Sequence, residues 1–210
     1  MPIIGVDLSG PANAANTAVV VFQEIGAVLH YDGMHEGTDG QIHELALDQQ
    51  GNGLAVFGLD APLSYQQGGG DRARDAELRQ LIVAHGLNPG SVMPPTAPRM
   101  GYLTLRGLAV SRLLSMDGVS VVEVHPGATL ALRHAPLAAV LAFGNNIDAR
   151  HQLLAWLGDQ GMLGIQPPAP CTSHFVASCA AALAAWKWAH GQSVWVAEAE
   201  FPHHPFAFAC

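Results

Sequence analysis

The sequence predicts a single mixed α/β domain in which helices cover a central sheet. Apolar, β-branched runs dominate the region before Asp60, and further runs of this kind then alternate with helical patterns. Chains with this order of elements bury the apolar faces of a sheet against helices. The 210 residues are 50% hydrophobic and 12% charged, which suffices for a substantial core and excludes disorder. We find no internal repeat and no domain boundary, so residues 1–210 are predicted to form one domain.

Most strands are predicted in the amino-terminal part of the chain, from apolar or β-branched runs bounded by turn residues. The predicted strands there cover residues 3–8, 17–23, 27–31 and 54–60. The run 54–60 is continuously apolar, which is typical of a strand buried on both faces. A short helix is predicted over 41–48, with Asp39 as its cap.

Helices dominate the remainder of the chain. After Gly68, Gly69 and Gly70, a helix is predicted over 71–84, because Asp71 can cap it and Gly86 can end it. A proline-rich connector follows that helix. The other predicted elements are a helix over 100–116, a strand over 119–125 that Pro126 ends, helices over 129–133, 147–157 and 175–190, and a last strand over 193–197.

Composition and charge exclude several classes of protein. The formal net charge of −8 repels polyanions, so a role with nucleic acid would need a local basic patch or metal ions. The first residues lack the basic start of a secretory signal, and the Ala-rich run 175–190 is too short and too polar to span a membrane. We therefore expect a cytoplasmic protein that makes no membrane contact. Its odd number of cysteines, three, predicts reduced thiols.

Carboxylates at the ends of apolar strands are the main candidates for chemistry. They are Asp7 in IIGVDLSG, Asp60 in VFGLDAPL and Glu123 in VVEVHPG. An acid in an apolar strand is costly unless it is hydrogen-bonded, paired or bound to a metal. Parallel strands would bring such acids together at one edge of the sheet, where α/β proteins keep their ligand sites. Carboxylate oxygens suit Mg²⁺ or Mn²⁺, which supports phosphoryl chemistry.

Each acid also has an ordinary structural explanation. Asp7 precedes Ser9 and Gly10, and Asp60 precedes Ala61 and Pro62, so either could bond its own backbone in a turn. Glu123 has no such turn context. The three acids taken together favour a site.

The basic residues cluster in one stretch of the chain. This stretch contributes six of the nine, namely Arg72, Arg74, Arg79, Arg99, Arg106 and Arg112. Arginine forks suit phosphate or carboxylate groups, so we take Arg72, Arg79, Arg99 and Arg106 as candidate substrate-binding residues. The alternative for Arg72 and Arg79 is a solvated helix face paired with nearby acids such as Asp75. The chain lacks the P-loop, the dinucleotide fingerprint, the serine-hydrolase nucleophile elbow and the zincin motif.

Several motifs occur together in a recognisable order. They are GVDLSG, GLDAPLSYQ, a Gly-rich loop followed by RARDAELR, then SVMPPT, YLTLRG, VVEVHPGATL and a late Ala-rich helix. In this order the chain resembles, from Ile3 to Ala209, the family catalogued as domain of unknown function 429 (DUF429). The resemblance implies a ribonuclease H-like fold with a mixed sheet of roughly five or six strands in the order 3-2-1-4-5, the first three antiparallel. The members of this family are described as predicted nucleases, so the resemblance also implies nuclease activity.

The resemblance further implies which residues occupy the motif positions. Asp7, Asp60 and Glu123 stand at the acidic positions, and the polar motif residues are Arg72, Asp75, Arg79 and Arg106. The family usually carries a late acid where this chain has Ala177. A missing fourth carboxylate weakens a second metal site, and His174 is an additional candidate ligand beside the three acids.

We therefore expect a metal-dependent nuclease or phosphodiesterase, in which Mg²⁺ or Mn²⁺ bound by Asp7, Asp60 and Glu123 activates a water. The partner would be nucleic acid or a nucleotide. A catalytically degenerate binding module for a nucleotide, a small anion or a protein partner is the alternative, which Ala177 favours. Phosphotransfer is a third hypothesis, because GVDLSG with Asn13 and Asn16 is similar to the first phosphate loop of sugar kinases. The apolar tail FPHHPFAFAC suggests a homodimer contact if it does not fold back on the core.

Overall fold

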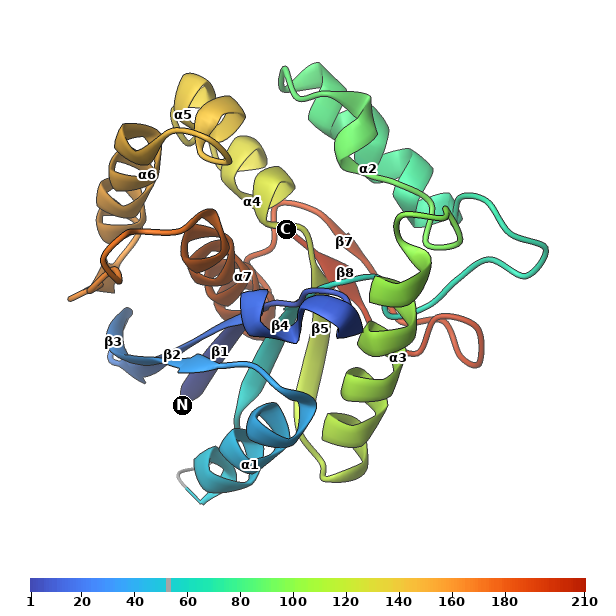
Figure 1. The fold of residues 1–210 in the computed structure, drawn as a ribbon, viewed down its shortest axis with the longest axis horizontal. Coiled ribbons are helices and arrows are strands. Elements are labelled where there is room, and N and C mark those ends of the chain that lie inside the picture. Colours follow the sequence, from blue (N-terminus) through green and yellow to red (C-terminus); the bar gives the residue numbers. More distant parts are fainter. Residues whose placement is uncertain (52–53) are drawn as a thin grey trace.

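A mixed sheet forms the centre of the computed structural model, which describes residues 1–51 and 54–210 (Figure 1). Across the sheet the described strands are β6 (Met162–Leu163), β3 (Val28–Glu36), β2 (Ala18–Ile25), β1 (Pro2–Asp7), β4 (Val56–Asp60), β5 (Ser120–Val124), β8 (Phe208–Ala209) and β7 (Val196–Ala197). Strands β1, β2 and β3 are antiparallel, whereas β4 lies parallel to β1 and β5 parallel to β4. The predicted α/β class and the ribonuclease H-like order 3-2-1-4-5 are confirmed.

The edges of the sheet differ from the prediction. Strands β6, β7 and β8 have two residues each and extend the sheet beyond the expected size. A strand of two residues is too short to show a periodic pattern, so the sequence predicts neither β6 nor β8. The carboxyl-terminal tail folds back, because β8 pairs with β5 and Cys210 is fully buried. The last four residues of the tail, 207–210, are thus part of the core, whereas Phe201 is 81% exposed.

Seven α-helices lie in the described part of the chain. They are α1 (Asp39–Gln50), α2 (Ala73–Ala84), α3 (Gly101–Met116), α4 (Pro126–Leu132), α5 (Leu137–Ala142), α6 (Ile147–Asp159) and α7 (Ser173–Ala189), with 3-10 turns η1 (Pro11–Asn16) and η2 (Pro89–Ser91). Every predicted helix is present, and α5 is an addition from an apolar run too short to show a helical period. Among these described residues, no helix has the length and apolarity needed to cross a bilayer.

Two helix starts correct the prediction. Thr38, not Asp39, caps α1, and it does so in a reciprocal pair with Gln41. Helix α2 begins after Arg72, whose backbone N–H donates to the Asp75 carboxylate at 2.9 Å. Asp71 instead pairs with Arg79. In both helices the residue at the observed cap, Thr38 or Arg72, is adjacent in sequence to the predicted cap. Only the geometry of the turn decides which of the two polar residues caps the helix.

The two faces of the sheet form separate cores, because successive residues of a strand point to opposite faces. Ile3 of β1 and Val56 of β4 belong to the core under α2, α4, α6 and α7. Ile4 of β1 and Phe57 of β4 belong to the core under α1 and α3. Figure 1 shows these two helical layers on either side of the strands. The central strands are apolar on both faces, as the continuous run 54–60 predicts.

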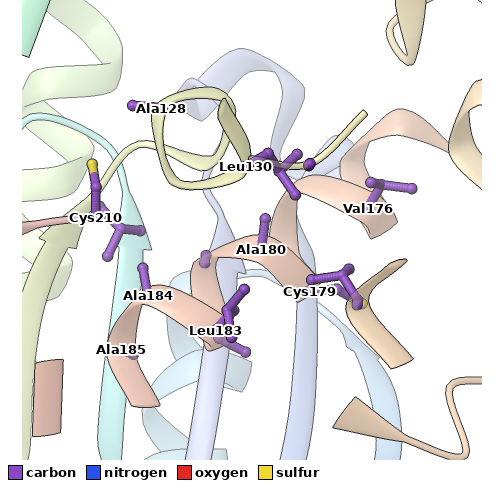
Figure 2. Packing of buried hydrophobic residues seen from close by; sticks show 14 of the residues in the cluster. Ala128, Leu130, Val176, Cys179, Ala180, Leu183, Ala184, Ala185 and Cys210 are labelled. Carbon is purple, nitrogen blue, oxygen red and sulfur yellow. The ribbon is translucent and has the colours of Figure 1, made fainter. Parts of the chain in front are cut away.

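Helix α7 packs directly on the backbone of the two central strands. A Cβ added at Gly5 would lie 1.9 Å from the Ser178 carbonyl oxygen, and one added at Gly58 would lie 2.5 Å from that of Ala181. The facing side of α7 is made of small residues, so the helix can approach this closely. Figure 2 shows Ala180, Ala184 and Ala185 along α7, with Leu130 of α4 packed above it. The three cysteines, Cys171, Cys179 and Cys210, are buried free thiols.

Gly5→Ala should therefore destabilise the protein by about 1–3 kcal/mol, because the new methyl group meets helix backbone that cannot move aside. The change in the free energy of unfolding would be measured by urea denaturation. Gly10→Ala is the matched control, because its φ of −65° suits alanine and no atom lies within 4 Å of its added Cβ. Equal stabilities of the two variants would contradict the close packing of α7.

Candidate functional site

Two carboxylates lie side by side at the carboxyl ends of the two central strands. Asp7 ends β1 and Asp60 ends β4, and the two residues are partners in the parallel register of these strands. Both occupy the sheet face covered by α7, in step with Gly5 and Gly58. Side chains at equivalent positions of neighbouring parallel strands lie next to each other on the same face. The predicted meeting of strand-end acids at one edge of the sheet thus occurs for this pair.

Proximity and burial change the titration of Asp60. Its pKa lies well above the ordinary value of 3.8, chiefly because the group is buried, and secondly because the Asp7 carboxylate is close and hydrogen-bonded to it. Glu123 adds a smaller repulsion in the same direction. Protonation of Asp60 removes the repulsion between two adjacent anions.

His174 extends this pair into a chain of three titratable groups. Its Nδ1 lies 2.6 Å from the Asp7 Oδ2, and the side chains of His174 and Asp7 are 46% and 14% exposed. The position follows from the start of α7, where Thr172 caps the helix and presents its first turn to the strand ends. The hydrogen bond to Asp7 raises the pKa of His174 above its ordinary value of 6.5, against the opposing effect of burial.

The register of the sheet puts Glu123 on the other face from the acid pair, although Glu123 lines the same small cavity as Asp60. It is the partner of Leu59, the residue before Asp60, and Leu59 faces the core under α1 and α3. Both of its carboxylate oxygens accept hydrogen bonds from Arg72, and Oε2 also accepts from the Leu63 backbone N–H at 3.0 Å. The structure gives Glu123 a guanidinium partner, and its predicted role as a metal ligand stays a prediction.

Arg72 is the centre of a buried ionic cluster. Its side chain is 2% exposed, and besides Glu123 it donates to both oxygens of Asp75 and to the Ser64 hydroxyl. Burial alone would lower the pKa of Arg72, but the two carboxylates outweigh that effect and raise it. A buried cation between two anions stays charged and keeps all its donors in fixed directions. This cluster joins β5, α2 and the loop after β4.

The other candidate arginines have different surroundings. Arg79 pairs with Asp71 and donates to the Val92 carbonyl. Arg106 is buried and donates to Asp39, to the Thr17 hydroxyl and to the carbonyls of Ser9 and Gly37. Arg99 is exposed and makes no hydrogen bond to any residue that the structure describes. The substrate-binding role of Arg72, Arg79, Arg99 and Arg106 stays a prediction, and Arg99 has the guanidinium most open to a ligand.

The donor groups fit one divalent cation better than two. Within residues 1–51 and 54–210, no group of three or more His, Cys, Asp or Glu side chains is arranged to hold a metal ion. Asp7 and Asp60 nevertheless supply two adjacent carboxylates, and Mg²⁺ is often bound by one or two carboxylates with water completing the shell. Ala177 lies one turn along α7 from His174 and is buried, so it adds no ligand.

Sequence reasoning missed two polar residues near this region. Ser64, in the loop after β4, hydrogen-bonds both Arg72 and His204 of the tail. Ser64 and His204 are 140 residues apart, and neither occurs in a motif of known chemistry. The only sequence signal is position, because the loop after a central strand is where α/β proteins place functional groups.

Replacing Arg72 by Met should cost about 3–5 kcal/mol, because Glu123 and Asp75 would be left as buried charges without a partner. Arg79→Met should cost less, about 1 kcal/mol, since the Arg79 and Asp71 side chains are partly exposed, at 24% and 34%. Urea denaturation of the two variants measures the difference. Similar losses in both would show that Arg72 does not hold the cluster together.

Asp60→Asn should stabilise the metal-free protein near neutral pH. Because the pKa of Asp60 is raised on folding, the folded state holds a proton that the unfolded state has lost, so stability falls as pH rises from about 4 toward the raised pKa. Asparagine removes that loss, so the gain should be clear at about pH 7 and small at about pH 4. Urea denaturation in chelator at both pH values tests this, with the exposed Asp159→Asn as control. A destabilised Asp60→Asn protein at neutral pH would contradict it.

Comparison with known proteins gives one match. A family model described as "Protein of unknown function (DUF429)" matches residues 5–201. Searches of curated proteins and of solved structures found no similar protein. The match begins within β1, ends at Phe201, and includes both acids of the pair.

Proposed function

Since the chain belongs to the DUF429 family, whose members share no established function, we propose from its site that it is a metal-dependent phosphodiesterase or nuclease. The proposed site is the Asp7 and Asp60 pair, at the edge of a ribonuclease H-like sheet. The observation that carries the proposal is this pair of adjacent carboxylates, in which repulsion and burial raise the pKa of Asp60. A divalent cation would relieve that repulsion.

In this proposal Asp7 and Asp60 would hold one Mg²⁺ or Mn²⁺ ion. The bound ion would activate a water and stabilise the leaving oxygen of a phosphodiester. His174, hydrogen-bonded to Asp7, would supply a proton to the leaving oxygen. Exposed Arg99 would contact the phosphate. Nucleic acid or a nucleotide is the proposed substrate.

A second candidate is a binding module without turnover, for a nucleotide, a small anion or a protein partner. Two observations favour it: Glu123 is neutralised by Arg72, and Ala177 supplies no carboxylate on α7. A ligand held without a metal would then bind equally well in chelator.

The first test is calorimetric titration of Mg²⁺ and of Mn²⁺ into chelator-stripped protein. We expect one ion per chain, and we expect Asp7→Asn and Asp60→Asn each to abolish binding while Asp159→Asn retains it. The reason is that two carboxylates supply all the protein ligands of the proposed site. Circular dichroism would show that the variants remain folded.

Catalysis is tested on the same proteins. Cleavage of single-stranded DNA, RNA and a nucleotide phosphodiester should require added metal and be lost in Asp7→Asn. Cation binding without any cleavage would favour the binding module. Failure to bind either cation, or full activity of Asp7→Asn, would overturn the proposed metal site.

A further inference from the structure

A cavity of about 420 Å³ is lined by Ser64, whose hydroxyl accepts from Arg72, and by neither residue of the acid pair. The loop after β4, helix α3 and the carboxyl-terminal tail form its walls. Residues with polar or titratable side chains line much of it, namely Ser64, Tyr65, Gln66, Gln67, Arg112, Glu200, His203 and His204. Its volume lies in the range of small-molecule sites.

A hydroxyl and an imidazole meet in the wall of this cavity. The Ser64 Oγ lies 2.8 Å from the His204 Nδ1, and Ser64 is buried while His204 is partly exposed. This is the distance at which a base removes the proton of a nucleophile. The two residues come from elements far apart in the chain, and Arg74 fixes the tail through the carbonyls of Glu198 and Phe206.

The direction of the Ser64 proton follows from its two partners. Arg72 Nη1 donates to the Ser64 Oγ at 2.9 Å, and a guanidinium can only donate. When the imidazole carries its proton on Nε2, the Ser64 hydroxyl donates to the Nδ1 of His204. The hydrogen bond from Arg72 would persist on a Ser64 alkoxide and stabilise it.

The surroundings of His204 keep its imidazole neutral. Burial lowers its pKa below 6.5, and the cations Arg74 and Arg72 add to that effect, while Glu200 and Glu123 oppose it more weakly. A neutral imidazole can take up a proton near neutral pH. The Ser64 hydroxyl, the His204 imidazole and the Arg72 guanidinium together form an arrangement suited to a nucleophile. The proposed metal site uses none of these three groups.

We propose that Ser64 is the nucleophile, and His204 its general base, of a second active site that hydrolyses carboxylic esters with an apolar acyl group. The proposal is independent of the acid pair and requires no metal. Its two reacting groups lie on the wall of a cavity that opens to solvent along Arg112 and the tail.

The chemistry balances within these groups and water. The Ser64 Oγ attacks the ester carbonyl carbon and forms a new C–O bond, and its proton passes to the His204 Nδ1. Arg112 lines the same cavity and faces the negative charge that develops on the carbonyl oxygen. The bond to the alcohol then breaks, and the alcohol leaves with the proton from His204. Water next attacks the acyl group while giving a proton to His204, and Ser64 recovers that proton as the acid is released.

The class of ester follows from a second cavity beside the first. It measures about 380 Å³ and shares Tyr65 and Leu108 with the first cavity. The rest of its wall is Pro95, Thr96, Pro98, Gly101, Tyr102, Thr104 and Leu105. Tyr102 and Leu105 are 72% and 63% exposed, so this apolar surface has no protein partner among the described residues. An acyl chain attached at Ser64 would pass Tyr65 and bury itself there.

The test compares p-nitrophenyl acetate with p-nitrophenyl octanoate in the presence of chelator. We expect kcat/KM to be at least ~10-fold higher for the octanoate, because its chain gains apolar contacts that the acetyl group lacks. Leu105→Ser should remove most of that preference, because it should lower kcat/KM for the octanoate far more than for the acetate. No hydrolysis, or no preference for the longer chain in the unchanged protein, would overturn the proposal.

Substitutions of two neighbouring histidines in this cavity test whether His204 is the general base. His204→Asn should lower kcat/KM by at least ~100-fold, the size of a general-base contribution. His203→Asn is the matched control, since His203 lines the cavity but makes no hydrogen bond to the described residues, and it should retain activity within about two-fold. Equal effects of the two variants would overturn the role of His204.

Labelling of the unchanged protein tests the nucleophile without a destabilising substitution. A fluorophosphonate should add one equivalent to Ser64, located by mass spectrometry of peptides, and the labelled protein should lose ester hydrolysis. Asp7→Asn should label and hydrolyse the ester normally, which separates this site from the proposed metal site. Labelling elsewhere, or none, would overturn the proposal whatever the result of the metal titration.

Discussion

The buried ion cluster around Arg72 is the interaction on which both sites depend. One guanidinium with 2% exposure connects Glu123 of β5, Asp75 of α2 and Ser64 of the loop after β4. Taking these charges out of water is costly, and the cost is offset only while every donor and acceptor has its partner. The cluster therefore fixes the spacing between the fourth and fifth strands and the helix beside them.

The cluster also decides which acids remain available for chemistry. Glu123 is paired with Arg72. Among the described residues, His174 is the only nearby basic partner of Asp7 and Asp60. The chain has nine basic residues against seventeen acids, and several arginines bond backbone carbonyls instead of acids. Arg74 and Arg150 illustrate this use, the first holding the tail and the second holding the loops beside α6.

The sequence allowed the order of the long elements to be predicted, because each has a clear period, an apolar run or a cap. It also allowed Asp7 and Asp60 to be predicted as neighbours, since both end parallel strands. The sequence does not show that Glu123 points to the other face of the sheet. A shift of one residue in the strand register reverses the face of a side chain, and the run VVEV reads the same in either register. Arg72 bonds Ser64 and Glu123 across 8 and 51 residues, and Ser64 bonds His204 across 140 residues, separations that no local pattern reveals. Two-residue edge strands likewise have no pattern to detect.

The glycine contacts under α7 have a consequence for the accuracy of the acid pair. A helix that rests on side chains can tilt or slide as those side chains change rotamer, but α7 rests on the backbone of β1 and β4 at Gly5 and Gly58. Its first turn, which carries His174, is then as stiffly placed as the strands that end at Asp7 and Asp60. The backbones of His174, Asp7 and Asp60 share one rigid frame, so only side-chain rotamers can change the distance between the imidazole and the two carboxyls.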